Sequence, residues 1–125
     1  MVDTGIFATT AEVGYKAGLT ASATSIAVDY VNSYMTQVES FINVACKYNF
    51  SDAYTTLNVD VKGILKECAS NLAAIYCIEY DMSGATATSL ERLDSEDKIN
   101  ILYKRAMDCL KILQDEDIQK WMIGA

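Results

Sequence analysis

The chain of 125 residues contains no histidine, no proline and a single tryptophan. Histidine is the commonest general base in enzymes and a frequent metal ligand, so both kinds of site lose their usual residue. Di-metal sites built from Glu-x-x-His on two helices are excluded for the same reason. The lack of proline removes the residue that breaks helix interiors, and therefore favours long helices.

Basic residues are also few, with ten Lys and Arg against seventeen Asp and Glu, for a net charge of −7. Binding to a phosphate backbone needs Lys and Arg gathered on one face, and here they are scattered among acids. We therefore expect no specific binding of nucleic acid. No apolar run approaches the roughly 20 residues that span a bilayer, and the N-terminus has no basic segment before an apolar one. We expect neither a membrane partner nor a signal peptide.

The four cysteines, Cys46, Cys68, Cys77 and Cys109, form no CxxC pair, and each lies within an apolar helical pattern. Such cysteines are typical of reduced thiols packed in a core. Acidic pairs such as Glu96 and Asp97 fit helix ends, where the helix dipole favours them. The chain has no P-loop. The sequence thus predicts no enzyme, with no catalytic, cofactor-binding or metal-binding residues.

The segment from Asn58 to Gly84 is the strongest structural signal. Between Cys68 and Ile78 its apolar residues cover all sides of a 3.6-residue turn. A helix that is apolar all round is buried on more than one face, so other segments must pack around it. We predict that it is the central helix of the fold, with Asp60 in its first turn.

Two further helices carry regular apolar seams with alternating spacings of three and four. The first is expected from about Ile26 to Lys47, capped by Thr24 or Ser25, and the other begins after a cap at Asp94 or Ser95. Their seams are Val28, Val31, Met35, Val38, Ile42 and Ala45, and Ile99, Leu102, Ala106, Cys109 and Leu113. Off-seam residues such as Glu39 are expected to face water.

The predicted fold is all-α, a bundle of three long helices with a short N-terminal element and an extended C-terminal tail. We divide the chain into residues 1–25 (N-terminal arm with a short helix capped by Thr9 or Thr10), 26–114 (helical bundle) and 115–125 (C-terminal docking tail). The polar stretch from Ser83 to Leu93 is expected to be a loop, because it consists mainly of small residues.

Three segments have no obvious role within a lone bundle. The tail carries the only Trp beside other apolar residues, which is typical of an interface anchor, although the tail could equally pack onto its own bundle. The N-terminal segment is either an arm or a cap over one end of the bundle. The stretch 83–93 is either a plain connector or an insertion into a partner. The candidate partner-binding residues are Ile6, Phe7, Ile118, Trp121, Met122 and Ile123.

The order of these elements resembles the small helical head–tail connector, or head-completion, proteins of tailed bacteriophages. The likeness covers about residues 25–125 and rests on packing positions. The quoted segments are the helix end from Ile42 to Tyr48, a loose match at Leu65, Cys68 or Ala69, Leu72 and Ala73, and the pattern Tyr103, Ala106 and Leu110. The acidic and then apolar tail differs from the family's tails, which have a Gly followed by a short strand-like run.

The resemblance implies a structural protein of the virion neck, assembled in the host cytoplasm. Such proteins form a ring, commonly of twelve copies, between the portal protein and the tail or a stopper protein. The ring extends a channel through which DNA passes without specific binding. Alternatives are another neck or tail-completion subunit, or a small cytoplasmic helical module that binds one protein partner.

Overall fold

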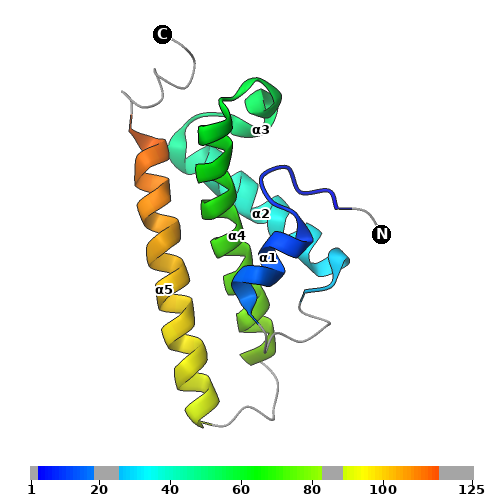
Figure 1. Ribbon diagram of the computed structural model, residues 1–125, viewed down its shortest axis with the longest axis vertical. Coiled ribbons are helices and arrows are strands. Elements are labelled where there is room, and N and C mark those ends of the chain that lie inside the picture. The colour runs from blue at the N-terminus through cyan, green and yellow to red at the C-terminus, as the bar shows by residue number, and fades with distance from the viewer. Residues whose placement is uncertain (1–2, 19–25, 83–88, 116–125) are drawn as a thin grey trace.

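The computed structural model describes residues 3–18, 26–82 and 89–115, with side chains for 3–18, 26–80 and 96–115. The all-α prediction is confirmed, since these residues form five α-helices and a 3-10 turn and contain no strand. The elements are α1 (Thr10–Ala17), α2 (Val28–Cys46), α3 (Phe50–Ala53), η1 (Tyr54–Thr56), α4 (Val59–Met82) and α5 (Ser89–Gln114) (Figure 1).

Helix α4 is the centre of the fold, as its sequence predicts. It packs against α1, α2 and α5, and α5 runs antiparallel along its length (Figure 1). Cys68, Ala69, Ala73, Ala74 and Cys77 are completely buried, so the helix is covered on several sides. The side chain of Asn58 accepts a hydrogen bond from the amide of Asp60 at 2.8 Å and thereby helps start the helix.

Helix α2 follows its predicted seam, with Val31, Met35, Val38 and Ile42 buried. The predicted cap at Thr24 or Ser25 is wrong. The N-cap is Ala27, which makes no side-chain hydrogen bond, so the helix begins without a capping side chain. It ends where Lys47 adopts the left-handed conformation with φ 55°, and the Lys47 amide donates to backbone carbonyls of the last turn.

Helix α5 also keeps its seam, in which Leu102, Ala106 and Leu113 are buried. Its predicted start at Asp94 or Ser95 is wrong, because the helix begins at Ser89. The stretch 83–93 is therefore not a continuous loop: residues 83–88 lie outside the described structure and the rest is helical. The sequence Leu-Glu-Arg-Leu at 90–93 consists of strong helix formers, which extend the helix backwards.

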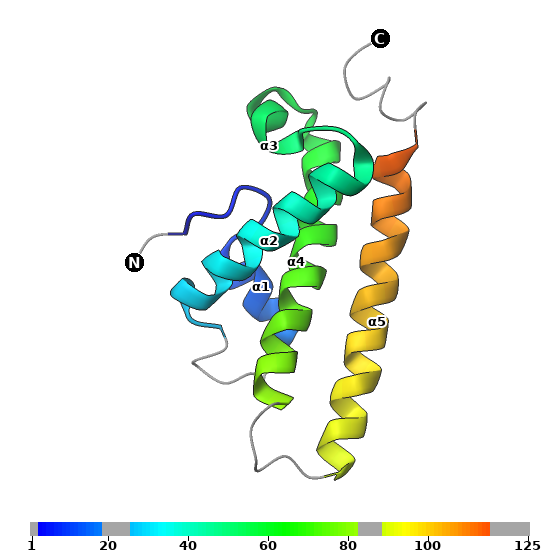
Figure 2. The same cartoon turned by 180° about the vertical axis from the view of Figure 1, so that it is seen from behind.

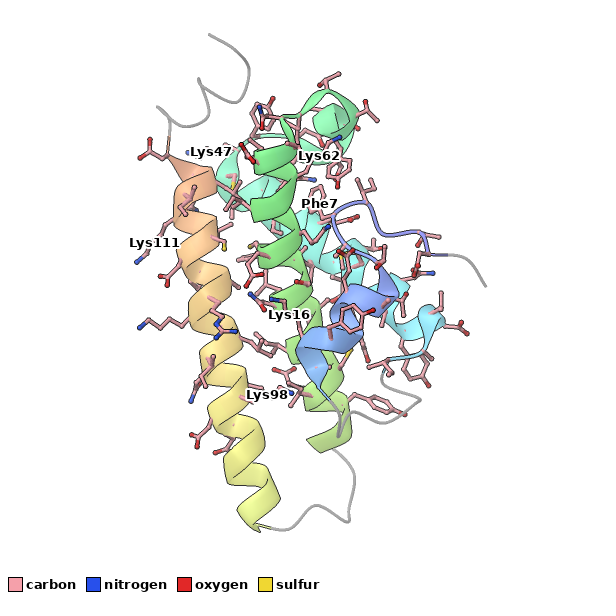
Figure 3. The ribbon with its side chains drawn as sticks, in the orientation of Figure 1. Phe7, Lys16, Lys47, Lys62, Lys98 and Lys111 are labelled. Carbon is pink, nitrogen blue, oxygen red and sulfur yellow. The ribbon has the colours of Figure 1, made fainter. Side chains whose placement is uncertain are left out.

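Helix α1 is short and held at both ends. Thr9, one of the two predicted caps, forms a reciprocal capping box with Glu12 at its start. Gly18 ends it with φ 95°, a conformation that favours glycine. The Lys98 ammonium of α5 donates to the carbonyl of Ala17, so a cation from another helix neutralises this C-terminus (Figure 3).

Residues 3–9, which we call the N-terminal strap, lie along α2 and are not a free arm. Glu39 of α2 was expected to face water, but it is 91% shielded, and its Oε2 accepts from the amides of Ile6 at 2.6 Å and Phe7 at 2.9 Å. The Thr4 amide donates to Asn32 Oδ1 at 3.0 Å. These tertiary bonds explain the error, since helical spacing alone cannot show that a carboxylate has backbone partners.

The strap fits closely against α2. Phe7 is buried in the core, and its ring centroid lies 5.9 Å from that of Tyr54 in η1. A Cβ at Gly5 would lie only 2.6 Å from Cγ of Met35 and 2.8 Å from the carbonyl oxygen of Ala8. The strap therefore needs glycine at this close approach.

Candidate interaction surface

An apolar groove opens where α2 crosses α4 beside α5. Figure 2 shows α2 in front of α4, with its C-terminal end near that of α5 and its N-terminal end turned away. The groove has a volume of about 180 Å³, and each of the three helices contributes two side chains. These are Val38 and Phe41, Leu72 and Tyr76, and Tyr103 and Met107.

The helix register produces this groove. Near the C-terminal ends of both helices, the side-chain amide of Gln114 donates to the carbonyl of Ala45 at 3.1 Å and joins the last turns of α5 and α2. Met107 and Tyr103 lie seven and eleven residues before Gln114, so they fall on nearly the same face of α5. The two helices diverge below this contact, and the aromatic side chains between them remain partly uncovered.

The rim of the groove is aromatic and accessible. Phe41 is 47% exposed, Tyr76 37% and Tyr103 55%. The Tyr76 ring stacks on Tyr34 of α2, with centroids 5.3 Å apart. One turn further along α4, Tyr80 meets Tyr30 edge-on at 5.4 Å. Contiguous exposed apolar surface, with Tyr and Met at its centre, is typical of protein-binding sites.

The two predicted partner-binding residues that the structure describes, Ile6 and Phe7, do not line this groove. Phe7 lies in the core of the chain, and Ile6, on the strap, is 41% exposed. Ile118, Trp121, Met122 and Ile123 lie outside the described residues.

Two ion pairs join α1 to α4 away from the groove. Lys16 binds Glu67 at 2.8 Å and Lys66 binds Glu12 at 2.9 Å. The hydrogen bond from Lys16 lowers the pKa of Glu67 despite its partial burial. Burial acts to raise the pKa of Glu12, but hydrogen bonds from Lys66 and the Thr9 backbone outweigh it and lower that pKa. These pairs fasten the short helix and offer no reacting group.

The thiols are also unsuited to chemistry. None of the four cysteines forms a disulfide; three are buried and Cys109 is half-buried. Burial raises the pKa of Cys46 to about 11 and that of Cys68 to about 12, which suppresses the nucleophilic thiolate. Cys68 Sγ instead donates to the carbonyl of Ala106 at 3.5 Å.

Within residues 3–18, 26–80 and 96–115, no three acidic or Cys side chains are arranged to hold a metal ion. None of the helices that the structure describes is both long and apolar enough to cross a bilayer.

Sequence reasoning did not recognise the groove, although it used several of its residues. Val38 was placed in the seam of α2, and Leu72 and Tyr103 were quoted only as packing positions of the other two helices. The available signal was that large aromatic residues lie just off the regular seams of all three helices. That signal does not show which of them meet on one face, because the answer depends on how the helices cross.

Comparison with known proteins leaves the groove as the main clue to function. No family model, curated protein or solved structure matches this chain. The packing positions of the sequence, the charge of the chain and the exposed groove are therefore the features that bear on its function.

Proposed function

We propose that the chain is a structural subunit of a tailed-phage virion, a head–tail connector located in the neck between capsid and tail. Copies assemble in the host cytoplasm into a ring, commonly of twelve, that binds the portal protein on one side and a tail or stopper protein on the other. In this proposal α2, α4 and α5 form one three-helix bundle as the body of the subunit. The chain is not an enzyme and needs no cofactor.

The positions that carry the family resemblance support this proposal. Ile42, Leu65, Cys68 and Ala106 are completely or almost completely shielded, and Leu110 is 6% exposed. Positions that a family shares for packing are expected in the core, and these five are there, whereas Leu72 and Tyr48 are partly buried and Tyr103 is exposed. A likeness that rested on surface residues would have argued less for a common subunit.

The observation that carries the proposal is the apolar groove between α2, α4 and α5. Phe41 and Tyr103 expose about half of their surface on one face, and each exposed aromatic loses favourable burial unless a partner covers it. Ring subunits bury such faces against their neighbours. A small helical protein with a large uncovered aromatic surface is suited to assembly.

The charge of the chain fits the same role. With a net charge of −7, a ring of copies would present a negative wall and repel a DNA backbone. DNA would then pass through the channel without specific binding.

A helical interaction module with one protein partner is the second candidate function. The groove favours it as much as it favours a ring, because an amphipathic helix can lie in a groove of three helices. The two candidates differ in stoichiometry. A connector gives a closed ring in the presence of the portal, whereas a module gives a one-to-one complex.

Electron microscopy and mass measurement of the full chain mixed with the portal of the same virus test the proposal. We expect a ring stacked on the portal, with many copies for each portal ring. A one-to-one complex with another protein, or no association with the portal, would overturn the connector role. Native mass spectrometry of the same sample counts the copies directly.

A variant that ends at Gln114 tests whether the tail makes the contact with the portal. We expect this variant to lose portal binding while its far-ultraviolet circular dichroism stays that of the helical chain. A variant with Ile101→Ser, which changes an exposed residue of α5 outside the groove, is the matched control and should bind normally. If the shortened chain binds the portal as well as the full chain does, the tail does not make this contact.

A further inference from the structure

The groove between α2, α4 and α5 has no occupant among the described residues, and the described structure stops at Asp115, one residue after the Gln114 side chain that joins α5 to α2. We propose that the chain's own C-terminal segment, Ile118 to Ile123, folds back into this groove, with Trp121 as the anchor. This inference concerns the free chain and does not rest on the virion role, in which a neighbouring subunit that binds the groove would displace the tail.

The apolar residues of the tail have the spacing of a helix that docks in a groove. Ile118, Trp121 and Met122 lie at i, i+3 and i+4, which places them on one side of a helical turn. The three residues before them, Asp115, Glu116 and Asp117, are acidic and suit a solvent-exposed reversal of the chain.

The length of the chain fits the distance to be covered. Along α5, Met107 lies about 10 Å and Tyr103 about 16 Å before Gln114, at 1.5 Å per residue. The four residues after Gln114 span at most about 13 Å when extended. Part of that span is used in the reversal, and a following helical turn adds about 6 Å, so Trp121 and Met122 can reach the level of Met107.

The groove also has the right size and chemistry for one indole ring. Its volume is about 180 Å³, and an apolar cavity of about 150 Å³ is known to accept a benzene ring. Val38 and Leu72 supply an apolar floor, while the hydroxyl groups of Tyr76 and Tyr103 at the rim offer acceptors for the indole N–H. Docking in the groove would therefore remove Trp121, the largest apolar side chain of the tail, from water.

The tail of the same chain is favoured over that of a second copy because of its local concentration. A segment tied to the groove by three residues is present at an effective concentration of the order of millimolar, with no loss of translational freedom on docking. A second copy would need a comparable concentration of protein to compete.

The single Trp makes the test direct, because intrinsic fluorescence at long wavelength reports Trp121 alone. In the full wild-type chain we expect blue-shifted emission and slow quenching by acrylamide. Tyr103→Ser should shift the emission to the red and raise the quenching constant several-fold. Ile101→Ser is the matched control, since Ile101 is 53% exposed on the same helix but does not line the groove, and it should change neither value.

Each other outcome overturns the proposal. Red, rapidly quenched emission in the wild-type chain means that the tail is not docked. Shielded emission that is the same in both variants places Trp121 somewhere other than the groove. A red shift on dilution shows that the groove takes the tail of a second copy. Circular dichroism melting of each variant confirms that it is folded, and Phe41→Ser provides a second change on the opposite wall.

Discussion

The carboxylate of Glu39 should decide whether the N-terminal strap stays on the molecule. It accepts two backbone hydrogen bonds from the strap, and the Phe7 amide that makes one of them is buried. Glu39→Ala leaves both amides without this acceptor. Hydrogen bonds to a charged group contribute about 1.5 to 3 kcal/mol each. The lower value applies here, because the Ile6 amide is only partly buried and water can replace its partner. We therefore expect a loss of about 3 kcal/mol in the free energy of unfolding.

Two further variants separate the contribution of the Glu39 charge from the effect of any substitution on α2. Glu39→Gln keeps an oxygen in place but removes the charge, and because charge-assisted bonds are roughly twice as strong as neutral ones it should cost about 1.5 kcal/mol. Gln37→Ala changes an exposed neighbour on α2 and should stay within about 0.5 kcal/mol of the wild-type chain.

Urea unfolding followed by circular dichroism measures the stabilities, since the helices make up most of the described structure. Hydrogen exchange at the amide of Phe7 gives the local readout. Protection there should fall in Glu39→Ala and remain in Gln37→Ala. A stable Glu39→Ala variant with a protected Phe7 amide would refute the reasoning, because the carboxylate would then contribute nothing to the strap.

Three other perturbations have defined outcomes. The pKa of Glu67 is lowered below 4.5 in the fold, so its pairing with Lys16 stabilises the chain above that pH and is lost as pH falls through the lowered pKa. In Lys16→Met, the free energy of unfolding should therefore fall by about 0.5 kcal/mol less than in the wild-type chain between neutral and acid pH. An unchanged pH dependence would refute the pairing. Cys68 should resist iodoacetamide at pH 8 until urea unfolds the chain; labelling at the rate of a free thiol would contradict its burial. Gly5→Ala should cost about 1 to 3 kcal/mol in urea unfolding, whereas Gly14→Ala, whose Cβ meets nothing within 4 Å, should gain up to about 1 kcal/mol; equal effects would contradict the close packing of the strap.

Periodicity was sufficient to predict the helices and most of the core. The seam residues Val31, Met35 and Ile42 and the all-round apolar stretch of α4 are buried as their spacing requires. The helix starts were less predictable, because small polar residues such as those before Ser89 fit both a loop and a first turn. Ala27 shows the same limit, since it begins α2 without the side-chain cap that a sequence pattern looks for.

Contacts between distant segments could not be predicted from local patterns. Glu39 lies off the seam of α2 and was assigned to water, but it is buried because the strap brings two amides to it. The groove depends in the same way on the angle at which α2 crosses α4. Its aromatic residues were visible in the sequence, while their convergence on one face follows from the packing of three helices.

The Lys98 cap on α1 has a consequence for synthesis on the ribosome. Helix α1 has eight residues, too few to be stable in isolation, and the groups that hold it are Lys66, Glu67 and Lys98. Lys98 is made 81 residues after the Ala17 carbonyl that it binds. Helix α1 therefore gains its last support only after α5 has begun to leave the ribosome, although its own eight residues are made long before.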